Sequence, residues 1–308
     1  MIDKKATIES NFKNKLYFFD SAREAWGQIL NSLPNGSRVL LPNYIGISER
    51  EGSGIYDPII ENKIKHEFYT LNKDLSISTK KIEEKLASNK YDLILIVNYF
   101  GFISSEINKS IELCKKHNLL IVEDCAHLYN YNLPQYDGYR EKVDFTFYSL
   151  HKYFPFENGG MLWQRNNSIN FRFKINKDIE SYAFKILSYD TYSIAQKRRA
   201  NFLRYEKLLK NIDGISFFKS LGKHDIPHNF PIIIENGLRE KLYFWMIDKG
   251  IHLIALYYKM IPPLDNVNNI DALMLSKNIL NLPLYQDIEE KDIKLIVKLL
   301  KKGLLEIK

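Results

Sequence analysis

A carboxylate, a hydroxyl and an amine follow two apolar runs of the chain that are predicted to be neighbouring strands. Asp124 comes just after the run over residues 119–122. Ser149 and Lys152 come after the run over residues 143–147, in the segment Ser149-Leu150-His151-Lys152. Ligands of open α/β sheets bind beyond the carboxyl ends of the strands, so these side chains are predicted to share one site.

This set of groups is what the chemistry of pyridoxal 5'-phosphate (PLP) requires. A lysine must form an imine with the cofactor aldehyde, and a carboxylate must keep the pyridine nitrogen protonated so that the ring accepts electrons. A hydroxyl and the amides of a helix N-terminus must hold the phosphate. Lys152 and Asp124 can supply the first two groups and Ser149 the hydroxyl. PLP is therefore the predicted cofactor, and no metal site is predicted.

Each of these side chains also has an ordinary structural alternative. A lysine in a loop is usually solvated, Asp124 could cap the next helix, and Ser149 could be a turn residue. His127, three residues after Asp124, could be a core histidine with satisfied hydrogen bonds. The residues favour the cofactor role for Lys152 and Asp124 and leave the other assignments open.

The first two-thirds of the chain alternates apolar runs with helical patterns. The continuous apolar run over residues 93–97 is typical of a strand that is buried on both faces. A helix is predicted over residues 107–117, where two lysines and a histidine suit its C-terminus. The remaining predicted strands cover residues 38–41, 119–122, 143–147 and 160–163. This order predicts an α/β domain with a largely parallel sheet.

The pattern changes after a long charged helix that is predicted over residues 194–211. The elements predicted beyond this connector are a strand over 230–234, a helix over 238–249, a strand over 251–256 and a helix over 287–302. We therefore expect a large domain over residues 1–194, followed by a connector helix and a small α+β domain over residues 195–308.

Several motifs, in order along the chain, resemble the DegT/DnrJ/EryC1/StrS family of PLP-dependent sugar aminotransferases. The most specific are Val-Glu-Asp-Cys-Ala-His at 122–127, Phe-Tyr-Ser-Leu-His-Lys at 147–152 and Glu-Asn-Gly-Gly at 157–160. Weaker matches are Ser-Ala-Arg-Glu-Ala at 21–25, Leu-Pro-Asn-Tyr at 41–44, Val-Asn-Tyr-Phe-Gly at 97–101 and Ile-Leu-Asn-Leu-Pro-Leu at 279–284. Any one match is weak, whereas the ordered series covers most of the chain.

The resemblance implies a role for each matching position. Lys152 would bind the cofactor aldehyde and move a proton between substrate and cofactor, and Asp124 would pair with the pyridine nitrogen. His127 would lie near the phenolic oxygen, at a position where the family often has Gln. The phosphate would be bound by Ser149, by Ser21 and by the amides of Ala22 and Arg23, at a helix N-terminus.

Some of these residues could have other structural roles. Ser21 could be an ordinary N-cap of a helix over residues 22–33, because capping and phosphate binding use the same amides. Arg23 lies outside the family pattern, so the direction of its side chain is open. His151 is expected to pack or orient its neighbours rather than to catalyse, and Tyr99 is expected to be a core residue.

The resemblance also implies a fold and an activity. The fold would be that of fold type I PLP enzymes, the aspartate-aminotransferase superfamily, in which active sites usually lie between two subunits of a homodimer. The activity would be transfer of an amino group, often from glutamate, to a keto sugar linked to a nucleotide diphosphate. Polysaccharide or glycoconjugate biosynthesis would be the setting.

The sequence departs from the family pattern on the substrate and partner sides. The family's Gly-Tyr-Asn-Tyr-Arg-Met segment is not recognisable between residues 163 and 196. Its His-Tyr-x-Pro-Leu-His segment appears only as residues 256–263, without the histidines. These departures leave open another PLP reaction on the same scaffold, such as elimination, dehydration or decarboxylation, and a PLP-binding protein without turnover. Retention of Lys152 argues against the family's dehydratase branch, in which histidine replaces the lysine.

Composition bears on whether the protein binds nucleic acid. The 308-residue chain has a formal net charge of +7, but its basic residues are scattered and no nucleic-acid-binding motif is visible. Nucleic-acid binding is therefore not expected, and a solvated surface accounts for most of these charges.

The location of the protein is also suggested by the sequence. No apolar stretch long enough to span a membrane is present, and residues 1–14 lack the apolar core of a secretory signal. The two cysteines, Cys114 and Cys125, do not form a disulfide framework. A reducing cytoplasm fits these features best.

Overall fold

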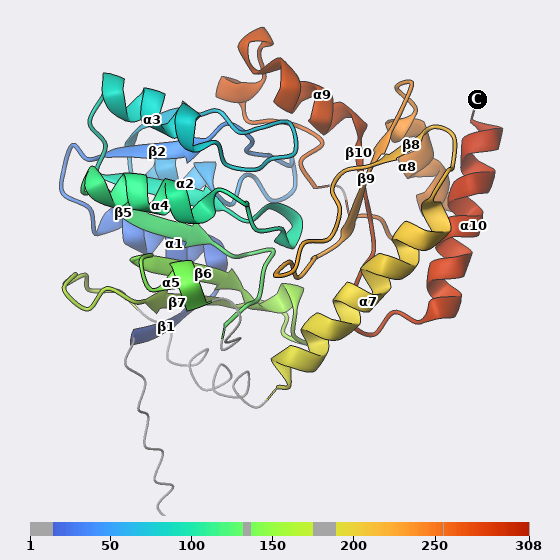
Figure 1. Cartoon of the computed structure of the whole chain (residues 1–308), viewed down its shortest axis with the longest axis horizontal. Helices are drawn as coiled ribbons and strands as arrows, with labels where there is room; N and C mark the ends of the chain where they lie inside the picture. The colour runs from blue at the N-terminus through green and yellow to red at the C-terminus, as the bar shows by residue number, and fades with distance from the viewer. Residues whose placement is uncertain (1–14, 132–136, 175–188, 255, 308) are drawn as a thin grey trace, which may run out of the picture.

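The computed structural model describes residues 15–131, 137–174, 189–254 and 256–307. Two β-sheets organise this part of the chain. A seven-stranded sheet has the strand order β1-β7-β6-β5-β4-β2-β3, and a three-stranded sheet has the order β10-β9-β8. Figure 1 shows the large sheet with its helices on one side of the molecule and the small sheet on the other.

The large sheet is mostly parallel. Strand β7 is antiparallel to both of its neighbours, and the other strand pairs are parallel. All three strands of the small sheet are antiparallel. The strands are β1 (Lys15–Phe19), β2 (Arg38–Pro42), β3 (Lys65–Tyr69), β4 (Leu93–Val97), β5 (Leu120–Asp124), β6 (Phe145–Ser149), β7 (Gly160–Gln164), β8 (Ile215–Phe217), β9 (Phe230–Ile234) and β10 (Ile279–Leu282).

Helices connect these strands. The α-helices are α1 (Ala22–Asn31), α2 (Tyr56–Glu61), α3 (Thr79–Ser88), α4 (Ile107–Lys116), α5 (Asp137–Arg140), α7 (Thr191–Leu209), α8 (Arg239–Asp248), α9 (Ile270–Asn278) and α10 (Glu290–Glu306). Short 3₁₀ turns are η1 (Tyr99–Gly101), η3 (Leu150–Lys152), η4 (Pro262–Leu264) and η5 (Val267–Asn269). No helix in the described ranges has the length and apolar composition that crossing a bilayer requires.

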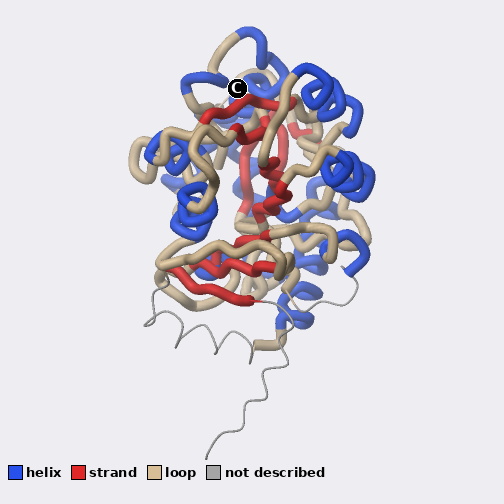
Figure 2. Tube along the Cα trace, turned by 90° about the vertical axis from the view of Figure 1, so that its left-hand side faces the viewer, coloured by secondary structure: helices blue, strands red, loops and turns tan. Residues whose placement is uncertain are grey.

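Helices cover both faces of the large sheet, as the edge-on view in Figure 2 shows. Helices α1 and α2 pack together, and α3, α4 and α5 form a second group. This division follows from right-handed crossovers, because connections that run in opposite directions along the sheet place their helices on opposite faces. Helix α7 packs against α10 and runs beside the small sheet (Figure 1). The expected α/β architecture with a mostly parallel sheet is confirmed.

The core forms where apolar faces meet the sheet. Every residue of β4 is buried, which explains its unbroken apolar sequence. On α1, the buried residues Ala25, Trp26, Ile29 and Leu30 form one stripe at helical spacing. The Trp26 indole N–H donates to the carbonyl of Ile55 at 3.0 Å, so this large side chain is buried without an unsatisfied polar atom.

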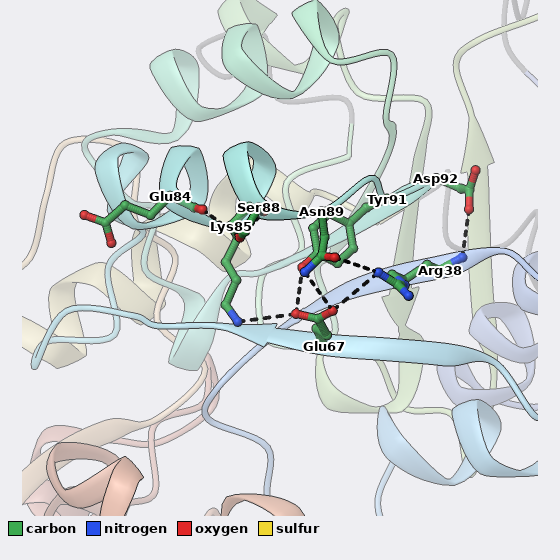
Figure 3. Close-up of polar contacts among 8 residues, drawn as sticks. All are labelled: Arg38, Glu67, Glu84, Lys85, Ser88, Asn89, Tyr91 and Asp92. Atoms are coloured by element: carbon green, nitrogen blue, oxygen red, sulfur yellow. Dashed lines mark hydrogen bonds and ion pairs between the residues drawn. The ribbon is translucent and has the colours of Figure 1, made fainter.

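A polar network holds the sheet edge that lies farthest from β1 (Figure 3). Glu67 of edge strand β3 accepts a hydrogen bond from the Tyr91 hydroxyl at 2.8 Å and lies 3.6 Å from the Arg38 guanidinium and 3.5 Å from the Lys85 amine. Burial, together with the bond to Glu67, raises the pKa of Tyr91 to about 12. The network connects β2, β3 and α3 and places charge on an edge that could otherwise pair with another strand.

The close approach of α1 to β7 depends on a glycine. A Cβ on Gly160 would overlap the carbonyl of Ser21 and would lie 2.6 Å from the amide nitrogen of Ala22. The adjacent Gly159 adopts φ +132°, and its N–H donates to Asp20 at 2.8 Å. The Asn-Gly-Gly turn therefore lets the N-terminus of α1 lie directly against the start of β7.

One predicted element is wrong. In place of a strand over residues 251–256, the described residues form only an isolated bridge between Ile254 and Asn281. The N–H of Leu256 donates to the carbonyl of Ile254 at 3.0 Å and is therefore not paired with a neighbouring strand. Tyr257 then takes φ +57°, which turns the chain toward Gly46.

We expect Gly160→Ala to destabilise the protein by about 1–3 kcal/mol or more, because the added methyl meets backbone atoms that cannot move aside. Urea unfolding monitored by circular dichroism measures the change in the free energy of unfolding. Gly27→Ala in α1 is the matched control, since its Cβ would meet nothing closer than 3.8 Å. The free energy of unfolding of that control should rise by up to about 1 kcal/mol. Equal effects of the two substitutions would contradict the close-approach argument.

Candidate active site

The two charged residues singled out in the sequence lie at neighbouring strand ends. Asp124 is the last residue of β5 and pairs in register with Phe147 of β6. Ser149 ends β6, and Lys152 ends the 3₁₀ turn η3 that follows. Because β5 and β6 are parallel, their carboxyl ends open onto the same edge of the sheet, which is where α/β proteins bind ligands.

A cavity of about 660 Å³ lies at this edge. Its volume is within the range of small-molecule sites. All seven residues predicted from the sequence line it: Ser21, Ala22, Arg23, Asp124, His127, Ser149 and Lys152. Another wall is lined by residues 45–48 and 50–55 and by Leu256 and Tyr257. The fold therefore brings the predicted residues together from α1, β5, β6 and the segments that follow these strands.

Burial shifts the pKa values of the Asp124 carboxylate and the Lys152 amine in opposite directions. Burial raises the pKa of Asp124 to about 6, although the Ala126 N–H, which donates at 2.8 Å, and the charge of Lys152 oppose the shift. Burial also lowers the pKa of Lys152, while the negative charges of Asp124 and Glu51 favour its protonated form. Each group is thus held closer to its neutral form than in water, which suits a lysine that must attack a carbonyl as a free amine.

The N-terminus of α1 presents backbone amides to the cavity. Ser21 is the N-cap, and its hydroxyl accepts from the Glu24 N–H at 3.1 Å, so the capping role expected for this serine is present. The first intrahelical bond runs from the Ala25 N–H, which leaves the N–H groups of Ala22 and Arg23 ahead of the helical ladder. Anions bind readily at such a position.

The side chain of Arg23 is engaged by the loop that follows β2. Its guanidinium donates to the carbonyl of Glu51 and lies 3.5 Å from the Asp57 carboxylate. The Arg23 side chain therefore points to the residues that follow β2, which form a wall of the cavity, while its backbone N–H lies at the start of α1.

His127 packs within a group of rings at the base of the cavity. Its ring stacks on that of His228, with centroids 4.9 Å apart and planes at 15°, and its Nδ1 accepts from the Phe100 N–H at 3.4 Å. Burial, with the nearby charge of Lys152, holds the pKa of His127 well below its usual value. His127 is therefore a neutral, packed histidine that also borders the cavity.

Two further sequence expectations concern His151 and Tyr99. The Ser149 hydroxyl and Nδ1 of His151 lie 3.3 Å apart, in agreement with an orienting histidine. Tyr99 is 3% exposed, and its hydroxyl donates to the carbonyl of Tyr44, as expected for a core residue.

Sequence reasoning assigned no role to Tyr257. Its ring lines the cavity and lies edge-on to His127, with centroids 5.9 Å apart. Its left-handed backbone, at φ +57°, is unusual for a bulky residue and is typical of functional sites. The sequence marked the segment over residues 256–263 only as a departure from a motif. The placement of Tyr257 depends on the contacts of this segment with residues 45–47, which no local pattern indicates.

Comparison with known proteins finds a family match over part of the chain. Residues 60–178 match the model of the DegT/DnrJ/EryC1/StrS aminotransferase family, and this range includes Asp124, His127, Ser149 and Lys152. No curated protein sequence matches the chain.

Solved structures, among them a sugar aminotransferase, share the fold. PseC of Helicobacter pylori, an aminotransferase involved in the biosynthesis of pseudoaminic acid, superposes with a TM-score of 0.74 at 17% identity, over 94% of this chain and 87% of PseC. DesV of S. venezuelae superposes with a TM-score of 0.72 at 16% identity, over 93% and 84%. The PMP form of Spr1654, a sugar aminotransferase of Streptococcus pneumoniae, does so with a TM-score of 0.74 at 16% identity, over 96% and 88%.

At these identities the superpositions show a common fold, and the family match adds the class of enzyme. The three most specific motifs, at 122–127, 147–152 and 157–160, lie within the matched range, and residues of the first two line the cavity. Residues 60–178, which include Asp124 and Lys152, are thus similar to the DegT/DnrJ/EryC1/StrS aminotransferases, and PLP is the cofactor that this similarity indicates.

Proposed function

We propose that the protein transfers an amino group from glutamate to a keto sugar, with PLP as cofactor, at the cavity beyond β5 and β6. The observation that carries this proposal is that Asp124 and Lys152 border one cavity from neighbouring strand ends. The sugar is proposed to be linked to a nucleotide diphosphate and to serve polysaccharide or glycoconjugate biosynthesis. The description of Spr1654 as a sugar aminotransferase supports a sugar as the acceptor.

The groups around the cavity fit PLP. An amine for the aldehyde, a carboxylate for the pyridine nitrogen and helix-start amides for the phosphate all border the same space. When bound, PLP supplies an electron sink that stabilises negative charge on the reacting substrate carbon. Lys152, whose pKa is lowered by burial, would bind the aldehyde and would hold or move the proton of the substrate carbon.

Asp124 would provide the negative charge opposite the pyridine nitrogen. Its pKa of about 6 means that a neighbouring cation is needed to offset the cost of its buried charge. A protonated pyridine is such a cation, so the carboxylate and the ring would each favour the ionised form of the other. The neutral His127 would lie beside the phenolic oxygen, where it neither adds charge nor competes for the proton.

The phosphate end of the site would be the N-terminus of α1. The amides of Ala22 and Arg23, the Ser21 hydroxyl and the Ser149 hydroxyl would share the phosphate oxygens. Gly160 supports this role indirectly, because it permits the helix start to lie against the sheet.

The substrate side would be the wall formed by residues 45–55 and Tyr257. Arg50 on this wall is exposed and could face an anionic nucleotide diphosphate. The departure from the family motif over residues 256–263 falls on this side, so this wall is where we expect the choice of sugar to be made. The segment in which the family's partner-side motif was sought includes residues 175–188, which lie outside the described residues.

We propose a homodimer with shared active sites in the cytoplasm, on the basis of the family resemblance. The two-domain division, with residues 1–194 as the PLP-binding domain and residues 195–308 as connector and small domain, is kept as part of the proposal. The separate sheets built from β1–β7 and from β8–β10 support it.

We expect Lys152→Ala to abolish covalent attachment of PLP. Borohydride reduction followed by peptide mass spectrometry should find the cofactor on the peptide containing residue 152 in the native protein only. Lys197→Ala on the exposed face of α7 is the control and should label like the native protein. Attachment that persists in Lys152→Ala would contradict the assigned role.

For substrate class, we expect glutamate to convert protein-bound PLP to the pyridoxamine form, and nucleotide-linked keto sugars to return it. Absorption spectra follow the cofactor, and mass spectrometry of the sugar detects the added amine. Release of ammonia, water or carbon dioxide without amine transfer would favour another PLP reaction. Bound PLP that no amine converts would indicate a protein without turnover.

We expect Asp124→Asn to make the cofactor-free protein more stable at neutral pH, although it impairs PLP binding. The folded-state pKa of about 6 exceeds the ordinary value of 3.8, so the folded protein binds the additional proton and its stability falls as the pH rises between these values. Above pH 6 the buried charge costs about 3 kcal/mol, which the amide removes.

Urea unfolding of both cofactor-free proteins at several pH values measures this effect. The gain should be present at pH 7.5 and should vanish below about pH 4, where the native carboxyl is neutral in both states. A gain that does not depend on pH would show that the charge of Asp124 is not its cause.

A further inference from the structure

The backbone on the C-terminal side of the catalytic turn is held by two side chains that come from later in the chain. The carbonyl of Lys152 accepts from the Arg198 guanidinium at 2.9 Å. The next carbonyl, that of Tyr153, accepts from the Gln286 amide nitrogen at 3.1 Å. Arg198 lies on α7 and Gln286 follows β10, so two elements that come well after Lys152 in the chain hold the residue proposed to bind the cofactor.

Arg198 has a fixed geometry. It is 1% exposed, and its Nε donates to the Gln286 side-chain oxygen at 3.1 Å, while a terminal nitrogen donates to the carbonyl of His228 at 3.3 Å. Its guanidinium carbon lies 4.1 Å from the centre of the Tyr153 ring, as in a cation–π contact. A planar guanidinium with several donors can satisfy this set of contacts, whereas a lysine ammonium cannot reproduce it.

The hydrogen-bond partners named above are carbonyl and amide oxygens, and the charge of Asp287 also favours the ionised guanidinium, although burial lowers the pKa of Arg198 overall. Burying a cation against neutral oxygens is costly compared with pairing it with a carboxylate. A residue that contributed packing alone would not need the charge. The guanidinium provides directional hydrogen bonding, since its two terminal nitrogens donate to the carbonyls of residues 152 and 228 at the same time.

The other side of the turn is held by the sheet. The Leu150 N–H donates to the carbonyl of Gly159 at 2.9 Å, and the N–H groups of Tyr153 and Phe154 donate to the carbonyl of Leu150. Arg198 therefore completes the restraint of the Lys152 backbone from the side that the sheet does not reach. Arg198 is absent from the residues that line the cavity, so it acts on the chemistry through the residues that it contacts, of which Lys152 lines the cavity.

We propose that Arg198, supported by Gln286, is a positioning residue that fixes the backbone of Lys152 and thereby the direction of its amine in the cavity. The inference rests on the proposed role of Lys152 as the residue that binds PLP. It also connects the lysine to α7 and to the segment after β10, so a displacement of these elements would change the direction of the amine.

The test compares variants of the full-length protein. Arg198→Met removes the fork but keeps much of the volume, Arg198→Lys keeps the charge, and Gln286→Leu removes the second carbonyl contact. Arg199→Met is the matched control. Arg199 lies on the same helix and donates to the carbonyls of Gly222 and Asp225 at 2.8 and 2.7 Å, away from Lys152.

The measurement is the rate at which cofactor-free protein captures saturating PLP covalently, followed by absorption across a range of pH. We expect Arg198→Met to slow capture by on the order of 10²-fold, as misplacement of a reacting group does. A displaced amine is less buried, so its pKa should rise and the rate profile should shift to higher pH. Arg198→Lys should recover only a small part of the loss, and Arg199→Met should keep the native rate and profile.

The proposal is overturned if Arg198→Met keeps the native rate and pH profile, or if Arg199→Met loses as much. If Arg198→Met does not fold, Gln286→Leu decides by the same two readouts, because it leaves the buried guanidinium in place. A native protein that captures no PLP, or a Lys152→Ala variant that still captures it, would refute the proposed function and this inference with it. An effect of the control alone would refute only the inference.

Discussion

The site depends on the burial of two opposite charges at the ends of adjacent parallel strands. Burial raises the pKa of Asp124 and lowers that of Lys152, and each charge partly offsets the cost of the other. The parallel pairing of β5 with β6 makes this unavoidable, because both strands end at the same edge of the sheet. A cavity that keeps a carboxylate and an amine close to neutrality is unfavourable for stability and suited to a cofactor that brings its own charge.

The helix start on one side and the lysine on the other are brought to this edge by the same glycine turn. Gly160 pairs with Ser149 on one neighbouring strand and with Phe19 on the other, and the N-terminus of α1 lies against it. The amides that could hold an anion and the amine that could attack an aldehyde are therefore fixed relative to one backbone position. Any side chain at that position would move one of them.

The remaining walls of the cavity come from elements that are distant in sequence. The segment containing Tyr257 reaches the loop after β2 through the bridge between Gly46 and Met260, and Arg198 reaches the Lys152 carbonyl from α7. Leu256 and Tyr257 thus complete the cavity wall, and α7 contacts the backbone of its lysine, while the chemistry is built on the large sheet. The departure from the family motif over residues 256–263 affects this wall and leaves the strand ends intact.

The sequence by itself determined the strand-end chemistry and most of the elements. The buried strands could be predicted because apolar runs such as residues 93–97 are local signals, and Asp124 and Lys152 were identified because parallel strands must end together. The tertiary structure alone decided the bend after Ile254, the left-handed Tyr257 and the contact of Arg198 with Lys152. Each of these depends on a partner that lies 25 or more positions away along the chain or on another sheet, and side-chain periodicity carries no information about such partners.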